Sequence, residues 1–232
     1  MNTFRLLMTK KISASLALQA GLRGIEIMEK EFIRIVPVMN ENVNKKISRL
    51  IAAEHAVAFT SKNAVSAIAS HSELPNANWK IFCIEGATKN VVNKYFPGNS
   101  IKGTAKSALL LAEVIAEKSE ERKVIFFCGS KRMEDLPALL LSKGFDVEEV
   151  IVYKTELVPQ KIIDDFEGVA FFSPSAAESF FSVNTLKKNV VCFSVGKTTT
   201  EAIKKYTDNE VATAEKTSEE SILELAIKQS KH

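Results

Sequence analysis

Six short polar turns in this chain carry hydroxyl, glycine and lysine residues directly after an apolar run. Each is followed by a helical pattern, so each lies where a buried strand would lead into a helix. Backbone N–H groups at helix starts bind anions, and lysine adds positive charge. Together the turns predict a site for an anionic small molecule. They are Thr9-Lys10, Thr60-Ser61-Lys62-Asn63, Gly86-Ala87-Thr88, Gly129-Ser130-Lys131, Ser173-Pro174-Ser175 and Gly196-Lys197-Thr198-Thr199.

Each turn also has a simpler interpretation as a helix N-cap. Ser, Thr and Asn at a helix start accept hydrogen bonds from backbone amides that have no partner inside the helix. For a single residue this interpretation stays open. Six such turns at the ends of six strands favour a shared binding role.

The turns lack the residues of hydrolytic and nucleotide-dependent catalysis. None of the six turns contains a carboxylate pair, a Ser–His pair or a nucleophile elbow. Gly196-Lys197-Thr198 follows an apolar run, but a Walker A loop would need glycine where the chain has Val191. Gly86 and Gly129 stand alone in their turns, so there is no dinucleotide fingerprint. We therefore expect neither a P-loop nor a dinucleotide-binding site.

The histidines and cysteines do not indicate a metal site. They share no ligand spacing, and the three cysteines lie inside apolar runs that are typical of a protein core. We therefore expect no metal. The residues concerned are His55, His71, His232, Cys83, Cys128 and Cys192.

The apolar runs before the turns are continuous rather than alternating, which is typical of strands buried on both faces. They are Phe4 to Met8, Ala56 to Phe59, Ile81 to Ile84, Val124 to Phe127, Val169 to Phe172 and Val190 to Val195. Helical patterns lie between them, at Ala64 to Ser70, Ser107 to Glu117, Asp135 to Ser142, Ala176 to Phe181, Thr199 to Tyr206 and Ser218 to Lys228. This alternation predicts an α/β protein with doubly wound parallel sheets.

The sequence repeats with a period near half its length. Ala56 to Val65 resembles Gly168 to Ala177, and Lys80 to Thr88 resembles Val190 to Thr198, each about 110 residues later. A fainter repeat relates the segment from Leu6 to Phe32 to the segment from Phe126 to Val152. The order of units is A, B, A′, B′. A period of this length predicts two similar domains rather than a solenoid.

Two stretches of β-branched residues occupy equivalent places in the repeat, at about 32–39 and 150–157. We interpret them as connectors at which the chain crosses between domains. Residues 1–35 would then combine with 158–232 in a discontinuous domain, leaving 40–150 as an inserted domain. The prediction is two similar flavodoxin-like domains joined by a two-stranded β connector.

Composition agrees with two modest domains. The chain has 232 residues, of which 46% are hydrophobic, enough for two cores of roughly 110 residues each. Its net charge is only +3 and its basic residues are dispersed, so we expect no nucleic-acid partner. The start of the chain lacks the pattern of a signal peptide or membrane span. We expect a cytoplasmic monomer that does not bind membranes.

Four segments resemble the uroporphyrinogen-III synthase family in order and spacing. They are Phe59 to Val65, Gly144 through Val152-Tyr153-Lys154-Thr155, Phe171 to Ser175, and Val195 to Thr199. The resemblance implies an enzyme that closes hydroxymethylbilane, a linear tetrapyrrole bearing acetate and propionate chains, to uroporphyrinogen III. Ring D is inverted, water is lost, and neither metal nor organic cofactor takes part. The product feeds haem, sirohaem and cobalamin synthesis, and functional coupling to hydroxymethylbilane synthase is expected.

The resemblance also implies roles for particular residues. Tyr153 matches a tyrosine proposed to help the hydroxyl group leave, as an acid or through a hydrogen bond. Packing of a connector tyrosine is an equally open interpretation. The predicted substrate-binding residues are Lys10, Thr60, Ser61, Asn63, Thr88, Ser130, Ser173, Ser175, Lys197, Thr198 and Thr199.

The first turn departs from the family pattern. The family usually has Thr-Arg-Pro after its first strand, where this chain has Thr9-Lys10-Lys11. Lysine keeps the positive charge but loses the two-pronged contact that arginine makes with a carboxylate.

Two other classes of protein also fit the sequence pattern: a two-domain solute-binding protein, and a regulatory module that has kept the fold without the activity. Solute receptors are mostly exported, which the start of this sequence does not favour.

Overall fold

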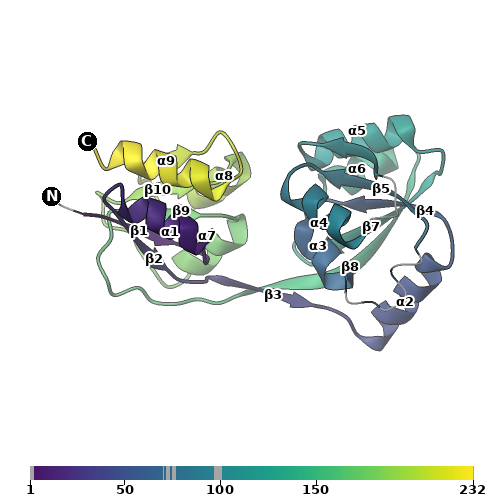
Figure 1. The fold of residues 1–232 in the computed structure, drawn as a ribbon, viewed down its shortest axis with the longest axis horizontal. Helices are drawn as coiled ribbons and strands as arrows, with labels where there is room; N and C mark the ends of the chain where they lie inside the picture. The colour runs from purple at the N-terminus through teal and green to yellow at the C-terminus, as the bar shows by residue number, and fades with distance from the viewer. Residues whose placement is uncertain (1–2, 70, 72–73, 75–76, 97–100, 232) are drawn as a thin grey trace. The chain divides into compact units, whose positions relative to one another are not determined.

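The computed structural model describes residues 3–69, 71, 74, 77–96 and 101–231, and its contacts divide the chain into two compact units (Figure 1). Unit 1 comprises Met1–Arg34 and Glu156–His232, and unit 2 comprises Ile35–Thr155. The boundaries fall inside the two stretches that we predicted as connectors. Their role as connectors and the domain limits stay predictions.

Unit 1 is built on a five-stranded parallel sheet with the order β11-β10-β9-β1-β2. Its strands are β1 (Phe4–Met8), β2 (Ile25–Glu29), β9 (Gly168–Phe171), β10 (Val191–Ser194) and β11 (Val211–Thr213). Numbered along the chain within the unit, this is the flavodoxin-like order 2-1-3-4-5. Strands from the two ends of the chain therefore share one sheet.

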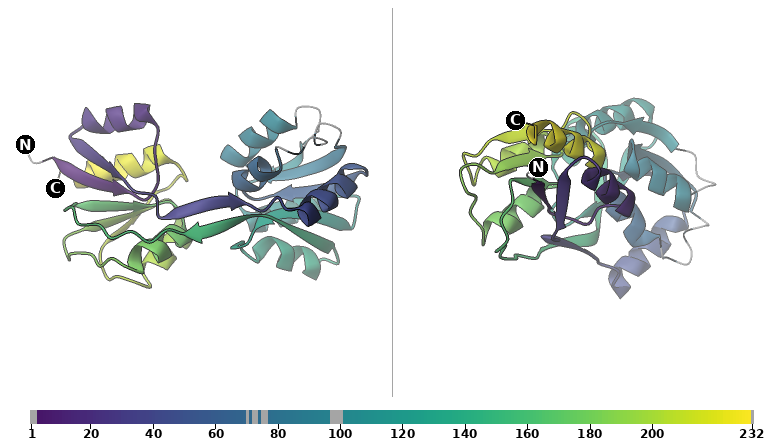
Figure 2. Two further views of the ribbon diagram at one scale, coloured as in Figure 1. Left: turned by 90° about the horizontal axis from the view of Figure 1, so that it is seen from below. Right: turned by 60° about the vertical axis from the view of Figure 1, so that its left-hand side comes forward.

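Helices cover both faces of the unit 1 sheet (Figure 2). On one face, α1 (Ala14–Gly21) and α9 (Glu219–Gln229) pack against Leu6 and Met8. On the other, α7 (Pro174–Phe181) and α8 (Lys197–Ile203) pack against Leu7 and its neighbours. Consecutive residues of β1 thus point into two different apolar layers, which explains why Leu6, Leu7 and Met8 are all apolar.

Unit 2 has a six-stranded sheet with the order β3-β8-β7-β4-β5-β6. Its strands are β3 (Ile33–Pro37), β4 (His55–Phe59), β5 (Trp79–Ile84), β6 (Ile101–Ala105), β7 (Lys123–Gly129) and β8 (Asp146–Leu157). If β7 and β8 are taken as the first two strands and β4, β5 and β6 as the next three, the order is again 2-1-3-4-5. Unit 2 is therefore a circular permutation of unit 1, as the repeat order A, B, A′, B′ requires.

The unit 2 sheet is also covered on both faces. Helices α2 (Glu41–Ile51), α3 (Lys62–Ile68) and α4 (Ala87–Tyr95) pack on one face. Helices α5 (Ala108–Lys118) and α6 (Asp135–Ser142) pack on the other. The parallel, doubly wound α/β fold expected from the sequence is confirmed in both units.

All six predicted strands and all six predicted helices are present, with ends that differ by about three residues or fewer. Ser70, the last residue of one predicted helix, lies outside the described residues. Helix α8 ends at Ile203 rather than at Tyr206. The apolar runs did not indicate α2, β6 and β11. Most residues of helix α2 are polar, and the two strands are short edge strands without a buried run.

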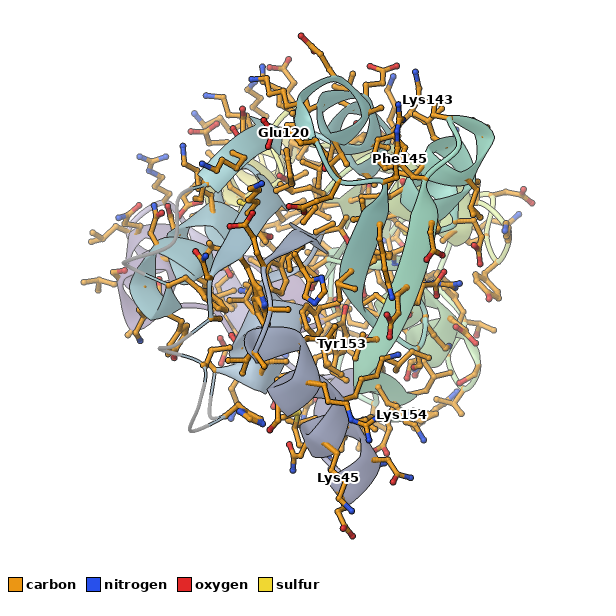
Figure 3. All side chains as sticks on the ribbon, turned by 90° about the vertical axis from the view of Figure 1, so that its right-hand side faces the viewer. Lys45, Glu120, Lys143, Phe145, Tyr153 and Lys154 are labelled. Atoms are coloured by element: carbon orange, nitrogen blue, oxygen red, sulfur yellow. The ribbon has the colours of Figure 1, made fainter. Side chains whose placement is uncertain are left out.

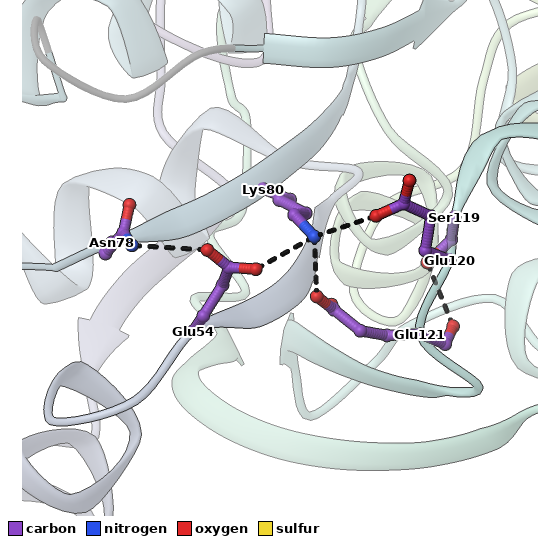
Figure 4. Close-up of polar contacts among 6 residues, drawn as sticks. All are labelled: Glu54, Asn78, Lys80, Ser119, Glu120 and Glu121. Carbon is purple, nitrogen blue, oxygen red and sulfur yellow. Dashed lines mark hydrogen bonds and ion pairs between the residues drawn. The ribbon is translucent and has the colours of Figure 1, made fainter.

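Lys80 gathers three carboxylates at the start of β5 (Figure 4). Its Nζ lies 2.8 Å from Glu54 Oε1, 3.0 Å from Glu121 Oε1 and 3.3 Å from Glu120 Oε2. The hydrogen bond with Lys80 lowers the pKa of Glu54, and bonds to Glu54 and Glu121 raise the pKa of Lys80. The cluster joins the loop before β4 to the loop after α5, at the end of the sheet opposite the polar turns.

We expect Lys80→Met to lower the thermal unfolding midpoint at neutral pH, because three carboxylates then face one another without their cation. The pKa of Glu54 is lower in the folded state. The stabilisation is therefore present above the unfolded-state pKa and is lost as pH falls through the folded-state pKa. The difference from wild type, followed by circular dichroism from pH 7 to pH 3, should shrink below about pH 4.

The control is Lys118→Met, which replaces an exposed lysine of α5 for which the described part of the chain shows no ion pair. It should change the midpoint little at any pH. A loss in Lys80→Met that stays constant with pH would contradict the electrostatic explanation.

Candidate active site

Three of the predicted turns lie along one edge of the unit 1 sheet. Strands β1, β9 and β10 are parallel neighbours, so their carboxyl ends meet there. Thr9 donates from its backbone N–H and its hydroxyl to the carbonyl of Ala170, at 3.1 and 2.8 Å. The strand order reverses between β1 and β9, and ligands of doubly wound sheets bind at this switch point.

Ser173 acts as a helix cap in this edge. Its Oγ accepts a hydrogen bond of 3.1 Å from the backbone N–H of Ala176 and begins α7, with Pro174 in the first turn. Ser175 in the same turn is half-buried. The capping interpretation is thus confirmed for Ser173, whose hydroxyl already has a structural partner.

The side chains in the turn after β10 differ in their exposure to solvent. Lys197 and Thr198 are exposed, while Thr199 is buried. The hydroxyl of Thr200 hydrogen-bonds to Ser194 and, at 2.7 Å, to Thr213. This network holds the start of α8 against β10 and β11. The sequence pattern did not indicate it, because it depends on β11, which was not predicted.

Lys10 is held by two side chains at the same edge. Its ammonium pairs with Glu219 in the first turn of α9 and lies 4.9 Å from the ring centroid of Phe172. The lysine side chain is 35% exposed and the glutamate side chain 27%. Lys10 is therefore charge-compensated within unit 1.

Unit 2 has its own polar edge, formed by the turns after β7, β4 and β5. Ser61 Oγ caps α3 by accepting a hydrogen bond of 3.2 Å from Asn63 N–H, and Thr60 beside it is half-buried. Thr88 is buried in the first turn of α4. Its turn begins at Gly86, whose φ of 75° favours glycine.

Tyr153 lies in the second half of β8 (Figure 3). Phe145, the residue before the strand begins, lies toward its other end. Its half-buried ring packs against the core of unit 2. The ladder shifts so that Tyr153 pairs with Gly129, and the N–H of Ser130 donates to the Tyr153 carbonyl at 3.0 Å. Ser130 itself is exposed.

Glycine at position 129 makes room for this ring. A Cβ there would lie 2.4 Å from Cζ and 2.8 Å from Oη of Tyr153. The hydroxyl therefore sits beside the turn after β7, and no described residue hydrogen-bonds to it. Packing and hydrogen-bond donation are compatible here, because the ring packs while its hydroxyl keeps its hydrogen for another partner.

The structure thus divides the predicted site residues between two edges. The edge of unit 1 carries Lys10, Ser173, Ser175, Lys197, Thr198 and Thr199, and the edge of unit 2 carries Thr60, Ser61, Asn63, Thr88, Ser130 and Tyr153. Each edge combines hydroxyls and helix N-termini.

The cysteines have the character of core residues. Burial raises the pKa of Cys83 and Cys128 to about 11 and that of Cys192 to about 12, so the thiols stay protonated at neutral pH. Within the described ranges no three His, Cys, Asp or Glu side chains are grouped so as to hold a metal ion. No helix in the described part of the chain is long and apolar enough to cross a membrane.

Two parallel-sheet units with polar strand ends define a class of α/β proteins that bind small anionic molecules at sheet edges. Residues 14–224 match the family model of uroporphyrinogen-III synthase HemD, and the chain belongs to this family. It is accordingly a cyclising lyase of tetrapyrrole biosynthesis, which closes hydroxymethylbilane to uroporphyrinogen III. The family predicted from four sequence segments is confirmed.

Solved structures show the same fold. The uroporphyrinogen-III synthetase of Helicobacter pylori is 18% identical, with a TM-score of 0.71 over 97% of this chain and 99% of that chain. A mutant uroporphyrinogen III synthase of the extremely thermophilic bacterium Thermus thermophilus is 12% identical, with a TM-score of 0.66 over 98% of each chain. At these identities the comparison establishes the fold.

We expect Gly129→Ala to destabilise the protein by about 1 to 3 kcal/mol, because the added methyl group forces the Tyr153 ring from its position. Gly196→Ala is the matched control at a strand end of unit 1. A Cβ there would meet only Thr217 Cγ2, at 3.8 Å, and its φ of 167° is extended. Chemical denaturation would compare the two variants. Equal stability would show that the Tyr153 ring moves away without cost.

Proposed function

We propose that the polar residues of the two sheet edges bind the acetate and propionate groups of hydroxymethylbilane during its closure to uroporphyrinogen III. The carrying observation is that every turn after a central strand presents hydroxyls or a helix N-terminus, in a chain whose family acts on this polycarboxylate. Helix N-termini and lysines favour carboxylates, and hydroxyls donate hydrogen bonds to them.

The reaction places its main demand on geometry. The pyrrole nitrogens supply the electrons that expel the terminal hydroxyl as water and leave an azafulvene. Attack by the substituted carbon of ring D forms a spiro intermediate, which fragments and closes again with that ring inverted. The protein therefore has to hold the linear tetrapyrrole in a folded conformation and direct its second ring closure. Catalysis then depends mainly on how the substrate is positioned.

Tyr153 is the residue that we propose assists departure of the hydroxyl group. A proton or hydrogen bond from the phenol to that oxygen makes water the leaving group. Gly129 and the unit 2 core fix the ring, and no described residue occupies the hydroxyl. A phenol fixed in this way can donate a hydrogen bond to an incoming substrate without first breaking a hydrogen bond within the protein.

The remaining residues contribute individually modest amounts. Lys197 and Thr198 are exposed and able to meet a carboxylate directly. Ser61 and Ser173 already accept bonds as helix caps, so they contribute through the helix starts that they shape. A single hydrogen bond of this kind contributes about 0.5 to 1.5 kcal/mol.

The setting of the reaction is part of the proposal. We place the enzyme in the cytoplasm as a monomer that receives its substrate from hydroxymethylbilane synthase and serves haem, sirohaem or cobalamin synthesis. The low net charge of +3 supports a small-molecule substrate rather than nucleic acid.

The activity is tested by a coupled assay. Porphobilinogen deaminase generates hydroxymethylbilane, the protein is added, and the oxidised uroporphyrins are separated by chromatography. We expect isomer III in place of isomer I, which forms spontaneously. Isomer I alone, from protein shown to be folded, would contradict the assignment.

We expect Tyr153→Phe to lower turnover by about tenfold or more, because a positioned acid contributes about 10² to 10⁴ and a hydrogen bond less. The control is Tyr206→Phe, which alters a tyrosine of unit 1 that is 47% exposed. Isomer III formation at saturating substrate measures both. Unchanged turnover in Tyr153→Phe would remove this residue from the mechanism.

Thr198→Ala should cost less, at most about tenfold in kcat/KM, since one hydrogen bond contributes about 0.5 to 1.5 kcal/mol. The same assay at low substrate concentration measures it. A loss as large as that of Tyr153→Phe would show that Thr198 has more than a binding role.

A further inference from the structure

We infer that Glu219 is an internal counter-ion for Lys10, which a carboxylate of the substrate replaces on binding. This inference rests on the proposed function, because it takes Lys10 as a substrate-binding residue. It assigns to Glu219 a role in setting the affinity for polycarboxylates.

Lys10 has the contacts of a carboxylate-binding lysine, but the carboxylate that it contacts is that of Glu219. Its ammonium pairs with the Glu219 carboxylate and lies over the ring of Phe172, 4.9 Å from the centroid. Phe172 follows β9, the strand beside β1, so the lysine lies at the switch point of the unit 1 sheet. An anionic ligand at this edge would meet the ion pair rather than a free lysine.

Other carboxylates surround the same turn. Lys11 Nζ lies 3.8 Å from Glu31 Oε2, and Glu29 Oε1 accepts a hydrogen bond of 2.7 Å from Ile12 N–H. Glu220 follows Glu219 in the first turn of α9. Its pKa is lowered, mainly by its own backbone N–H, then by the Ser218 hydroxyl, with Lys10 adding to the effect. Several acidic side chains thus lie around the turn that differs from the family pattern.

Exchange of one carboxylate for another is physically easy here. Both partners are partly exposed, and an ion pair between partly exposed groups contributes little net stability. Phe172 contacts Lys10 independently of Glu219, so the lysine stays at the edge when the glutamate is replaced. Because the substrate has to displace Glu219 from Lys10, the net effect of Glu219 is to weaken substrate binding and to leave the chemical step unchanged.

The test is a set of variants assayed for isomer III formation: wild type, Glu219→Gln, Lys10→Met and the double variant. We expect Glu219→Gln to lower KM about threefold with kcat unchanged, and Lys10→Met to raise KM. In the Lys10→Met background, Glu219→Gln should no longer change KM. Glu224→Gln removes one negative charge from an exposed position of α9 and should leave KM as in wild type.

A higher KM in Glu219→Gln would overturn the inference, because Glu219 would then position Lys10 for the substrate. An equal decrease in the Lys10→Met background, or in Glu224→Gln, would also overturn it by showing a general effect of charge. Thermal unfolding confirms that each variant is folded.

A binding measurement keeps this inference separate from the proposed activity. Uroporphyrin III, an octacarboxylate that the enzyme cannot turn over, is used as the probe, and its fluorescence is followed during titration. We expect tighter binding to Glu219→Gln than to wild type, and equal binding would contradict the inference. If wild type formed only isomer I, the activity proposal would fail, while this titration would still decide the role of Glu219.

Discussion

Burial of each parallel sheet on both faces is the constraint on which the rest of the structure depends. Leu6, Leu7 and Met8 are fully buried and serve two different apolar layers, so this second part of β1 has no free position for a polar side chain. The same holds for Val57 and Ala58 in unit 2. Chemistry is therefore displaced to the strand ends, where the backbone turns into a helix and leaves N–H groups without internal partners.

The circular permutation makes the two units equivalent in sheet order without making their edges equivalent in chemistry. The turn after β1 and the turn after β7 occupy the same place in their sheets. The first holds Lys10 between Glu219 and Phe172, whereas the second has Gly129 beneath the ring of Tyr153. The turn after β1 thus presents a paired charge, and the turn after β7 an aromatic hydroxyl.

Elements that have a local sequence pattern could be predicted, whereas features that depend on contacts between distant segments could not. Strands β1, β4 and β9 were predictable because burial on both faces imposes a run of apolar residues in each. Helix α2 was not, because most of its residues are polar and its apolar residues form no continuous run. The ion pair of Lys10 with Glu219 requires α9 to pack beside β1, at the opposite end of the chain. The packing of Tyr153 against Gly129 requires a register shift between β7 and β8, and no local motif encodes that shift.

The weak acid–base character of these edges is consistent with a reaction that needs selectivity more than power. Hydroxymethylbilane closes spontaneously to the wrong isomer, so the enzyme has to favour one closure over another. A hundredfold preference corresponds to about 2.8 kcal/mol at room temperature. Two or three positioned hydrogen bonds of about 1 kcal/mol each supply that difference. In the proposed site, hydroxyls such as Thr198 and the phenol of Tyr153 are therefore sufficient groups, whereas additional carboxylates would repel a polyanionic substrate.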